Sequence, residues 1–451
     1  MSKITITPIS GYPEWTPGVR MQEQRLIDVI KRQYELFGFT SIETPAVERL
    51  EVLTAKGGMH RQIFTLGRLT EDEGGETLGM HFDLTVPLAR YVAQRSNDLV
   101  FPFRRYQIQK VWRGERAQRG RFREFYQCDI DIIGRKTLSV IQDAEIVAVI
   151  DSTLSAIREI TDGALPNHKI HLNHRKILSA LFAALKIDEA KSADVLREID
   201  KMSRDGKDAT KDRLKELGVS QSAVETIMAL TSSKELDEAR QLLASIKADD
   251  EGINEMSQVL ENALQLGVPR SNIVLGFGIA RGLDYYTGTV FETLIDGKEK
   301  WGSICSGGRY DDLASYFTTQ KFPGVGVSIG LSRLFDLMVQ SKIITIDCHT
   351  PTKVLVTAQD RENYLTDYLG LAKTLRDAGI NTEVFLDHLP LRDQMAYASK
   401  KGIPIAIIAG GDELSENAVL IKDLNHVTQE KISTGEMVRY IKRKLQSEPA
   451  A

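Results

Sequence analysis

The sequence predicts an α+β protein whose C-terminal part forms a separate α/β domain. Three observations support this prediction. Two strand-like stretches flank a basic loop within residues 104–134, apolar residues keep helical spacing through residues 166–268, and strands alternate with helices from residue 351 onward. That alternation predicts a largely parallel sheet in the C-terminal domain. The expected parts are a core of two segments, 1–165 and 269–345, a mostly helical insertion at 166–268, and the α/β domain at 351–451.

Composition and length describe a soluble protein with room for two or three domains. The 451 residues carry 58 Lys and Arg against 62 Asp and Glu, and 42% of them are hydrophobic. No stretch approaches the roughly 18 consecutive apolar residues of a membrane helix, and the first ten residues do not resemble a signal peptide. We expect a cytoplasmic protein with no membrane partner. The widely separated Cys128, Cys305 and Cys348 predict neither a disulfide framework nor a structural zinc site.

The N-terminal elements are predicted to be a loop, a helix and an interrupted strand. Residues 6–20 are rich in proline and glycine, which favours irregular backbone. Apolar residues recur at helical spacing from Met21 to Phe37, and Gly38 provides a stop. Pro45 interrupts the strand that follows, so we expect an edge or bulged strand. Such a strand suits a subunit boundary and an ordinary sheet edge equally well.

Asp83 and Thr85 form a candidate receptor for an amino group. They precede Pro87 and a short helix, in a stretch that we interpret as a strand, where their spacing places both side chains on one face. A carboxylate beside a hydroxyl suits an ammonium group. The alternative interpretation is that Asp83 is the N-terminal cap of the helix.

The stretch from residue 104 to residue 134 concentrates positive charge on a predicted hairpin. Between Arg104 and Arg123 lie one acid, Glu115, and eight basic residues, namely Arg104, Arg105, Lys110, Arg113, Arg116, Arg119, Arg121 and Arg123. A basic run is most often a solvated surface. Here aromatic residues are interleaved with the arginines, and arginine can pair with phosphate while an aromatic ring stacks on a base. The second strand also has a polar face at Gln127, Asp129 and Asp131. A phosphate-binding hairpin is the preferred interpretation.

The helical part of the chain contains one candidate metal site, which we reject. A long amphipathic helix is predicted over residues 141–160. Beyond it, His168, His171 and His174 are spaced by three. The stretch around them looks extended, and no carboxylate or cysteine accompanies the histidines, so no metal site is expected.

Glycine-rich stretches after residue 269 are candidates for ligand contact. Arg281 precedes the adjacent Tyr285 and Tyr286, and the glycines around them allow the backbone to approach a ligand closely. An arginine held over such a site could stabilise developing phosphate charge. Later, Arg333 lies in the early turns of a helix entered from a glycine-spaced strand, where an anion could meet both the helix dipole and the guanidinium.

One further glycine-rich stretch separates these two candidates. Gly307 and Gly308 are interpreted as a turn that leads to Arg309 and Tyr310. Glycine pairs of this kind discriminate poorly between functions, so this turn carries no assignment of its own.

Taken together, these stretches resemble class II aminoacyl-tRNA synthetases and, among them, the histidyl-tRNA synthetases, over nearly the whole chain. WRGERAQRGRFREF resembles motif 2 of that class, GVGVSIGLSRL resembles motif 3, and LFGFTSIETPAVE lies where motif 1 is expected. ARGLDYYTGTVFE and SGGRYDDL resemble the two signature peptides of the histidyl enzymes. The resemblance implies an antiparallel sheet flanked by helices, a helical insertion, a C-terminal α/β anticodon-binding domain and a homodimer.

The resemblance also implies an activity and its partners. L-Histidine would be activated with ATP and Mg²⁺ to histidyl-adenylate and then transferred to the 3′ end of tRNA(His), with release of AMP and pyrophosphate. The attacking carboxylate is already ionised, so the site must supply positioning and positive charge, and no strong general base is required.

The roles implied for individual residues divide into four groups. Arg281 and Arg113 assist activation. Histidine is bound by Asp83, Thr85, Gln127, Asp131, Tyr285 and Tyr286. ATP is bound by Arg113, Glu115, Arg121, Phe125 and Arg333, and no protein ligand is assigned to the metal. We hypothesise that Arg116, Gln118 and Arg119 meet the acceptor end of tRNA.

The sequence departs from one form of the family and leaves two other functions open. FDLT and DID stand where that form has glutamates, which bears on the branch of the family and not on the activity. A regulatory paralogue would bind histidine without aminoacylation, but such proteins usually lack the terminal domain and the arginine that Arg281 matches. A plain RNA-binding module would explain the basic loop but not Asp83, Gln127, Asp131 and Arg281 together.

Overall fold

The computed structural model describes residues 6–55, 62–68, 77–279, 286–312, 314–346 and 348–447, without the side chains of residues 203 and 204. The chain divides into two compact units. One comprises Met1–Glu14 and Arg25–Ile344, and the other comprises Trp15–Gln24 and Thr345–Ala451. Along the described ranges, no helix combines the length and the apolar character needed to cross a membrane.

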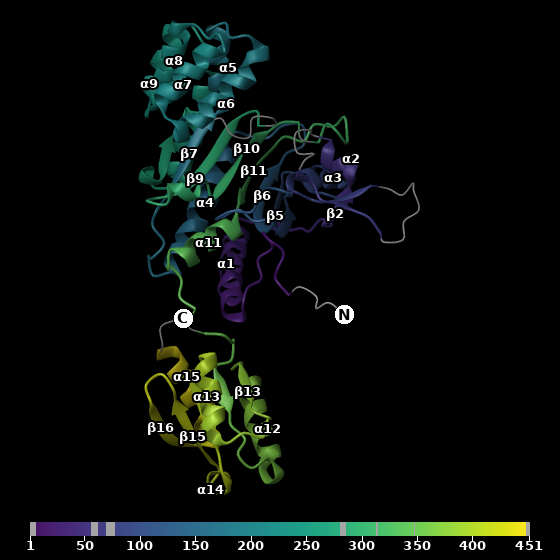
Figure 1. The fold of residues 1–451 in the computed structure, drawn as a ribbon, viewed down its shortest axis with the longest axis vertical. Helices are drawn as coiled ribbons and strands as arrows, with labels where there is room; N and C mark the ends of the chain where they lie inside the picture. Colours follow the sequence, from purple (N-terminus) through teal and green to yellow (C-terminus); the bar gives the residue numbers. More distant parts are fainter. Residues whose placement is uncertain are drawn as a thin grey trace. The chain divides into compact units, whose positions relative to one another are not determined.

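An eight-stranded sheet forms the centre of the first unit (Figure 1). Its strands are β1 (Thr40–Ser41), β5 (Phe103–Trp112), β6 (Glu124–Ile133), β7 (His168–His174), β8 (Ile273–Leu275), β9 (Thr289–Ile295), β10 (Cys305–Tyr310) and β11 (Gly324–Ile329). They lie in the order β1-β5-β6-β11-β10-β9-β7-β8. The two outermost pairings, β1 with β5 and β7 with β8, are parallel, and the five between them are antiparallel. The expected antiparallel sheet flanked by helices is confirmed.

The predicted N-terminal helix and the predicted edge strand are both present. α1 (Pro17–Leu36) ends just before Gly38, whose positive φ of 76° favours glycine. Leu26, Ile30 and Tyr34 recur on its buried face, and the Tyr34 hydroxyl donates to the Cys128 carbonyl of β6 at 3.0 Å. Burying each such apolar side chain is worth about 1.5–3 kcal/mol. β1 is the end strand of the sheet, as the interrupting proline predicts.

The helix α4 (Ile141–Glu159) is largely buried and packs against β7, β10 and β11 of the sheet and against α10. Its buried positions, such as Ile146, Val149 and Leu154, follow the predicted apolar spacing. α11 (Leu331–Gln340) follows β11 as predicted and packs against β6. A second, small sheet has the order β2-β4-β3. Its elements and the helices beside it are β2 (Val47–Arg49), β3 (Thr65–Leu66), β4 (Leu78–Met80), α2 (Leu50–Thr54) and α3 (Thr85–Arg95).

Six helices occupy residues 175–265, between β7 and β8 in the chain. They are α5 (Arg175–Ala184), α6 (Glu189–Asp205), α7 (Lys207–Glu216), α8 (Gln221–Ser232), α9 (Leu236–Ser245) and α10 (Glu251–Gln265). In Figure 1, α5 to α9 gather beyond one end of the sheet, and α10 returns to pack on α4, α5 and β7.

The stretch predicted as a glycine-rich turn is a central strand, β10, so that prediction is wrong. Gly307 and Gly308 pair with β9 on one side and β11 on the other. A Cβ on Gly307 would lie 2.1 Å from the Gly326 carbonyl oxygen, and one on Gly308 would lie 2.6 Å from the Thr289 carbonyl oxygen. The glycines are therefore needed for close strand packing, which the local sequence does not distinguish from a turn.

The second unit is a five-stranded sheet with the order β13-β12-β14-β15-β16. The prediction of a largely parallel sheet is wrong for half of it. β12 pairs in parallel with β13 and β14, whereas β15 pairs antiparallel with β14 and β16. The elements are β12 (Val354–Val356), α12 (Arg361–Asp377), β13 (Thr382–Val384), α13 (Leu391–Lys401), β14 (Ile405–Ile408), α14 (Gly411–Ser415), β15 (Ala418–Asp423), β16 (Thr428–Ser433) and α15 (Thr434–Ser447).

Candidate active site

The basic stretch forms the predicted hairpin. β5 and β6 pair from Phe103 opposite Ile133 to Trp112 opposite Glu124. The connection is docked on the start of α11 through its tip, Gly120. The Gly120 N–H donates to the Asp336 carboxylate at 3.0 Å, and Arg333 Nε donates to the Gly120 carbonyl at 3.1 Å. Both backbone polar groups of Gly120 are thus hydrogen-bonded to side chains of α11, which holds the loop in place.

A pocket of about 310 Å³ lies between this loop and the sheet. Three arginines and one carboxylate among its lining residues make it cationic overall. The predicted ATP-binding residues all line it, namely Arg113, Glu115, Arg121, Phe125 and Arg333. Gln127, Ser303, Ser306, Ser328 and Gly330 complete its polar wall.

A second pocket of about 130 Å³ adjoins the first. Of the residues predicted to bind histidine, Asp83, Thr85, Gln127, Asp131 and Tyr286 line it. Gln127, Asp129 and Asp131 enter it from β6, so the predicted polar face of that strand is confirmed. Tyr310, Gly326 and Ser328 contribute from β10 and β11.

Arg113 lines both pockets. Its Nε donates to the Phe82 carbonyl at 2.9 Å, and its guanidinium carbon lies 5.1 Å from the centre of the Phe125 ring. A longer contact of 3.5 Å reaches the Gln127 side-chain oxygen. Within the described ranges, no carboxylate forms an ion pair with Arg113, so its charge remains available to an anion from either pocket.

Asp83 is not on a strand, and the strand interpretation is wrong. It lies in the loop between β4 and α3, one residue before the N-cap position Leu84, and its carboxylate accepts a capping hydrogen bond from the Val86 N–H in the first turn of α3 at 3.0 Å. The alternative interpretation was therefore the right one for its local structure. The cap nevertheless holds Asp83 and Thr85 at the wall of the smaller pocket.

A buried ionic cluster, which the sequence patterns alone do not predict, lies at the smaller pocket. Arg105 on β5 is fully buried, and its Nη2 lies 2.5 Å from Asp131 and 4.0 Å from Asp129. The Tyr310 hydroxyl donates to Asp131 at 2.8 Å. Burial raises the pKa of Asp131 while Arg105 lowers it, and burial against the same opposing effect raises the pKa of Asp129 to about 7. This cluster could be predicted from the alternation of polar residues in the two strands once the hairpin register is known, because that register places Arg105 opposite Asp131.

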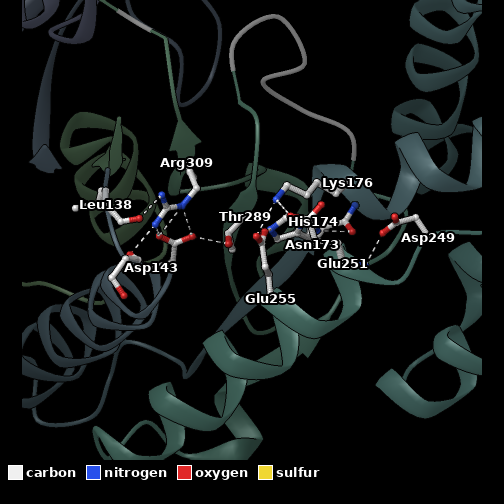
Figure 2. Close-up of polar contacts among 11 residues, drawn as sticks. Leu138, Asp143, Asn173, His174, Lys176, Asp249, Glu251, Glu255, Thr289 and Arg309 are labelled. Atoms are coloured by element: carbon white, nitrogen blue, oxygen red, sulfur yellow. Dashed lines mark hydrogen bonds and ion pairs between the residues drawn. The ribbon is translucent and has the colours of Figure 1, made fainter. Parts of the chain in front are cut away.

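Arg309 does not line either pocket, and its side chain instead contacts α4 and the residues just before that helix. It is buried, and its guanidinium donates to the Asp143 carboxylate at 2.8 and 3.1 Å and to the carbonyls of Leu138 and Ser139 (Figure 2). The Thr289 hydroxyl donates to the same carboxylate at 2.6 Å. This network ties β10 to α4.

The three spaced histidines on β7 do not share a partner. His168 Nε2 lies 2.9 Å from Asp151, and His174 Nε2 lies 2.9 Å from Glu255 of α10. Burial lowers the pKa of His171. In the part of the chain that the structure describes, no group of three or more His, Cys, Asp or Glu side chains is placed to hold a metal ion.

Comparison with known proteins identifies the family of the chain. Residues 12–334 match the family model described as histidyl-tRNA synthetase, and residues 352–444 match the one described as an anticodon binding domain. The chain belongs to the histidyl-tRNA synthetase family. It is accordingly an aminoacyl-tRNA synthetase, and the resemblance drawn from the motifs is confirmed.

Individual relatives support the same family over nearly their full length. A histidine–tRNA ligase from Xanthomonas axonopodis pv. citri is 43% identical, covering 97% of this chain and 95% of the relative. One from Clostridium tetani is 40% identical, covering 98% of this chain and 100% of the relative. The crystal structure of histidyl-tRNA synthetase from Nostoc sp. PCC 7120 matches with a TM-score of 0.89 at 37% identity, covering 98% of this chain and 100% of that chain.

Some residues predicted for this histidyl-tRNA synthetase lie away from the two pockets or outside the described residues. Arg281 and Tyr285 fall within residues 280–285, which are outside the described ranges. Arg116, Gln118 and Arg119 are exposed on the hairpin connection. The Arg119 guanidinium lies 4.1 Å from the centre of the Trp301 ring, a cation–π contact.

Proposed function

We propose that the larger pocket binds ATP and the smaller pocket binds histidine, with Arg113 between the two reacting groups. As a histidyl-tRNA synthetase, the chain activates histidine with ATP and transfers it to tRNA(His). The observation that carries the assignment of the pockets is that Arg113 lines both of them. A guanidinium in that position can contact the α-phosphate and the histidine carboxylate together.

In the activation step, an oxygen of the histidine carboxylate attacks the α-phosphorus of ATP. The bond from that phosphorus to the bridging oxygen breaks, and pyrophosphate leaves. Arg113 and Arg333, joined by Arg281, stabilise the negative charge that develops. In the second step, a hydroxyl of the terminal adenosine of tRNA attacks the acyl carbon, and AMP leaves.

The ATP contacts follow from the lining of the larger pocket. Phe125 stacks on adenine, and Arg121 and Arg333 contact the phosphates. Glu115 is the sole carboxylate among the described lining residues, and we assign it to the Mg²⁺ that accompanies ATP. When bound, Mg²⁺ neutralises phosphate charge. Glu115 would hold the metal together with the phosphate oxygens of ATP.

The histidine contacts follow from the smaller pocket. Asp83, Thr85 and Gln127 meet the α-amino group, for which a carboxylate, a hydroxyl and an amide oxygen are suitable acceptors. Asp131, Tyr285 and Tyr286 face the imidazole. The pocket then rejects side chains that leave its polar groups unpaired.

The tRNA contacts and the assembly belong to the same proposal. Arg116, Gln118 and Arg119 meet the acceptor end, and residues 352–444 meet the anticodon. The enzyme is a homodimer in the cytoplasm. The exposed end strand β1 is a suitable dimer edge, because its outer backbone groups have no neighbouring strand among the described residues.

Histidine-dependent exchange of pyrophosphate into ATP tests the proposed function. The full-length chain is expected to catalyse exchange with histidine and not with the other amino acids, and then to charge tRNA(His). Histidine binding without exchange would indicate a regulatory paralogue. RNA binding without either would indicate a plain RNA-binding module.

A further inference from the structure

The smaller pocket contains three carboxylates, and two of them already have hydrogen-bond donors. Asp131 is contacted by Arg105 at 2.5 Å and by the Tyr310 hydroxyl at 2.8 Å. Asp83 accepts from the Val86 N–H at 3.0 Å. Both oxygens of Asp131 and one oxygen of Asp83 therefore have a protein partner before a ligand arrives, and the second oxygen of Asp83 faces the α-amino group in the proposed function.

Asp129 differs from both. It is 3% exposed, and its Oδ1 has no hydrogen-bond partner among the residues that the structure describes. Its Oδ2 faces Arg105 at 4.0 Å, which is too long for a hydrogen bond. A buried acceptor without a donor lowers stability unless a ligand supplies the donor. Because Asp129 lines the smaller pocket, the missing donor is expected from the molecule bound there.

The reaction fixes the direction in which histidine lies. Its carboxylate must reach the α-phosphate of ATP, so the amino-acid backbone lies near Arg113 and Gln127, which line both pockets. The imidazole then points towards residues that line the smaller pocket alone. Along β6, Asp129 is one two-residue step beyond Gln127, about 7 Å, and Asp131 is one step further. Asp129 is thus the first carboxylate that the side chain meets.

We propose that Asp129 accepts a hydrogen bond from an imidazole N–H of bound histidine and so determines the specificity of the pocket. Asp131, which the proposed function also places at the imidazole, acts in addition as a positioning residue, because it contacts Arg105 and Tyr310. The inference rests on the proposed function and adds to it a residue that the family resemblance did not assign. An amino acid without a ring N–H would leave the Asp129 carboxylate unpaired.

The charge of the cluster agrees with this role. Burial raises the pKa of Asp129 to about 7 although Arg105 and the Ser328 side chain on the neighbouring strand lower it, so the carboxylate lacks full compensation before the ligand binds. Arg105 is one cation shared by two carboxylates. A ring N–H of the ligand supplies the donor that the Asp129 carboxylate lacks, whereas an apolar side chain does not.

The test compares Asp129→Asn with Asp131→Asn in the full-length chain by histidine-dependent pyrophosphate exchange. Losing a charge-assisted hydrogen bond is expected to raise the histidine KM of Asp129→Asn roughly tenfold or more and to leave the ATP KM within about twofold. Asp131→Asn is expected to change the histidine KM less and thermal stability more. The control is Asp208→Asn on α7, whose side chain is 94% exposed, and it is expected to change neither KM.

A second measurement uses the unmodified chain, so the folding of a variant does not decide the outcome. β-(Thiazol-4-yl)alanine, whose ring has no N–H, is expected to compete with histidine at least about tenfold more weakly than histidine binds. An unchanged histidine KM in folded Asp129→Asn, or equal binding of the analogue, would overturn the inference. Absence of exchange in the unmodified chain would instead overturn the proposed function.

Discussion

At the residue scale, the smaller pocket depends on a glycine in the neighbouring strand. Gly326 of β11 lies opposite Asp131 of β6. A Cβ at this position would lie 2.0 Å from the Asp131 Oδ1, far inside van der Waals contact. Only a hydrogen leaves the carboxylate room to meet Arg105 and Tyr310 together.

Gly326→Ala is therefore expected to displace Asp131 and disturb histidine binding. We expect the histidine KM in pyrophosphate exchange to rise roughly tenfold or more, which exceeds the effect of Asp131→Asn because the added methyl group also occupies the wall of the smaller pocket. The ATP KM should change little. Gly370→Ala in α12 is the matched control, because its Cβ would meet nothing within 4 Å. That substitution should stabilise the helix by about 0.5–1 kcal/mol. A folded Gly326→Ala enzyme with normal histidine use would refute the steric argument.

The site residues differ in how well the sequence predicts them, and the difference has a physical origin. Gln127 and Asp131 follow from the two-residue period of one strand, which is local information. Arg105 does not, because its partner lies across the hairpin and the register depends on how the connection folds around Gly120. Asp83 lines the smaller pocket, but it lies in a loop before α3 and not on the predicted strand, since capping and strand alternation both suit an aspartate before a short helix.

At the scale of single elements, the hairpin connection has two faces with different contacts. Arg113 and the exposed Arg121 line the larger pocket, whereas Arg116 and Arg119 are exposed and line neither pocket. The docking of Gly120 on α11 separates these faces, because it fixes the loop from behind.

Replacing Arg116 and Arg119 by alanine is expected to slow transfer to tRNA and to spare pyrophosphate exchange. The reason is that exposed arginines can contact the phosphates of the acceptor end while the ATP pocket keeps its own. Single-turnover transfer and exchange, measured on the same preparation, separate the two steps. Arg333→Ala is the contrasting variant and should raise the ATP KM in exchange. Loss of exchange in the double variant would indicate that the two exposed arginines act in ATP binding.

The Arg309 and Asp143 pair makes a second prediction for the elements it joins, β10 and α4. Arg309→Met leaves the Asp143 carboxylate buried without its partner, which should cost about 3–5 kcal/mol of stability. Thermal unfolding of the full-length chain measures the loss. Combining it with Asp143→Leu should restore much of the stability, because an apolar pair replaces the ionic one. No loss in the single variant would mean that the carboxylate finds other donors.

Elements with strong local periodicity were predicted well, and those set by distant neighbours were not. α1, α4, α11 and the β5–β6 hairpin follow from the spacing of apolar residues in their own sequences. β10 was mistaken for a turn because the neighbouring backbones that require its glycines are far away in the chain. The sequence pattern does not predict β16, because its residues, TQEKIS, are almost all exposed and polar. Without β16 the antiparallel half of the C-terminal sheet is not predicted either.

At the scale of the larger unit, ion pairs and hydrogen bonds between charged side chains join the helical insertion to the sheet. His174 at the end of β7 contacts Glu255 of α10, and Lys176 donates to Glu251 and Glu255 at 2.8 and 2.7 Å (Figure 2). The hydrogen bond from His174 holds the pKa of Glu255 at about 2, although burial opposes it.

This lowered pKa predicts an acid-dependent loss of stability. The contribution of Glu255 is fully present above its unfolded pKa of about 4.3 and is lost as the pH falls towards 2. At neutral pH, Glu255→Gln should cost about 1–2 kcal/mol, or about 2–6 °C in Tm, after allowance for partial exposure. The difference from the unmodified chain should shrink between pH 5 and pH 3. Glu251→Gln, with a 62% exposed side chain, is the control and should change little. A difference that is independent of pH would contradict the linkage.

The position of Arg113 between the two pockets has a thermodynamic consequence for the order of events. In the proposed assignment one guanidinium contacts two anions, so the free energy with which ATP binds is expected to depend on whether histidine is already present. Linkage requires the dependence to be equal in both directions, whichever substrate arrives first. The two substrates therefore communicate through a single side chain before any bond between them forms.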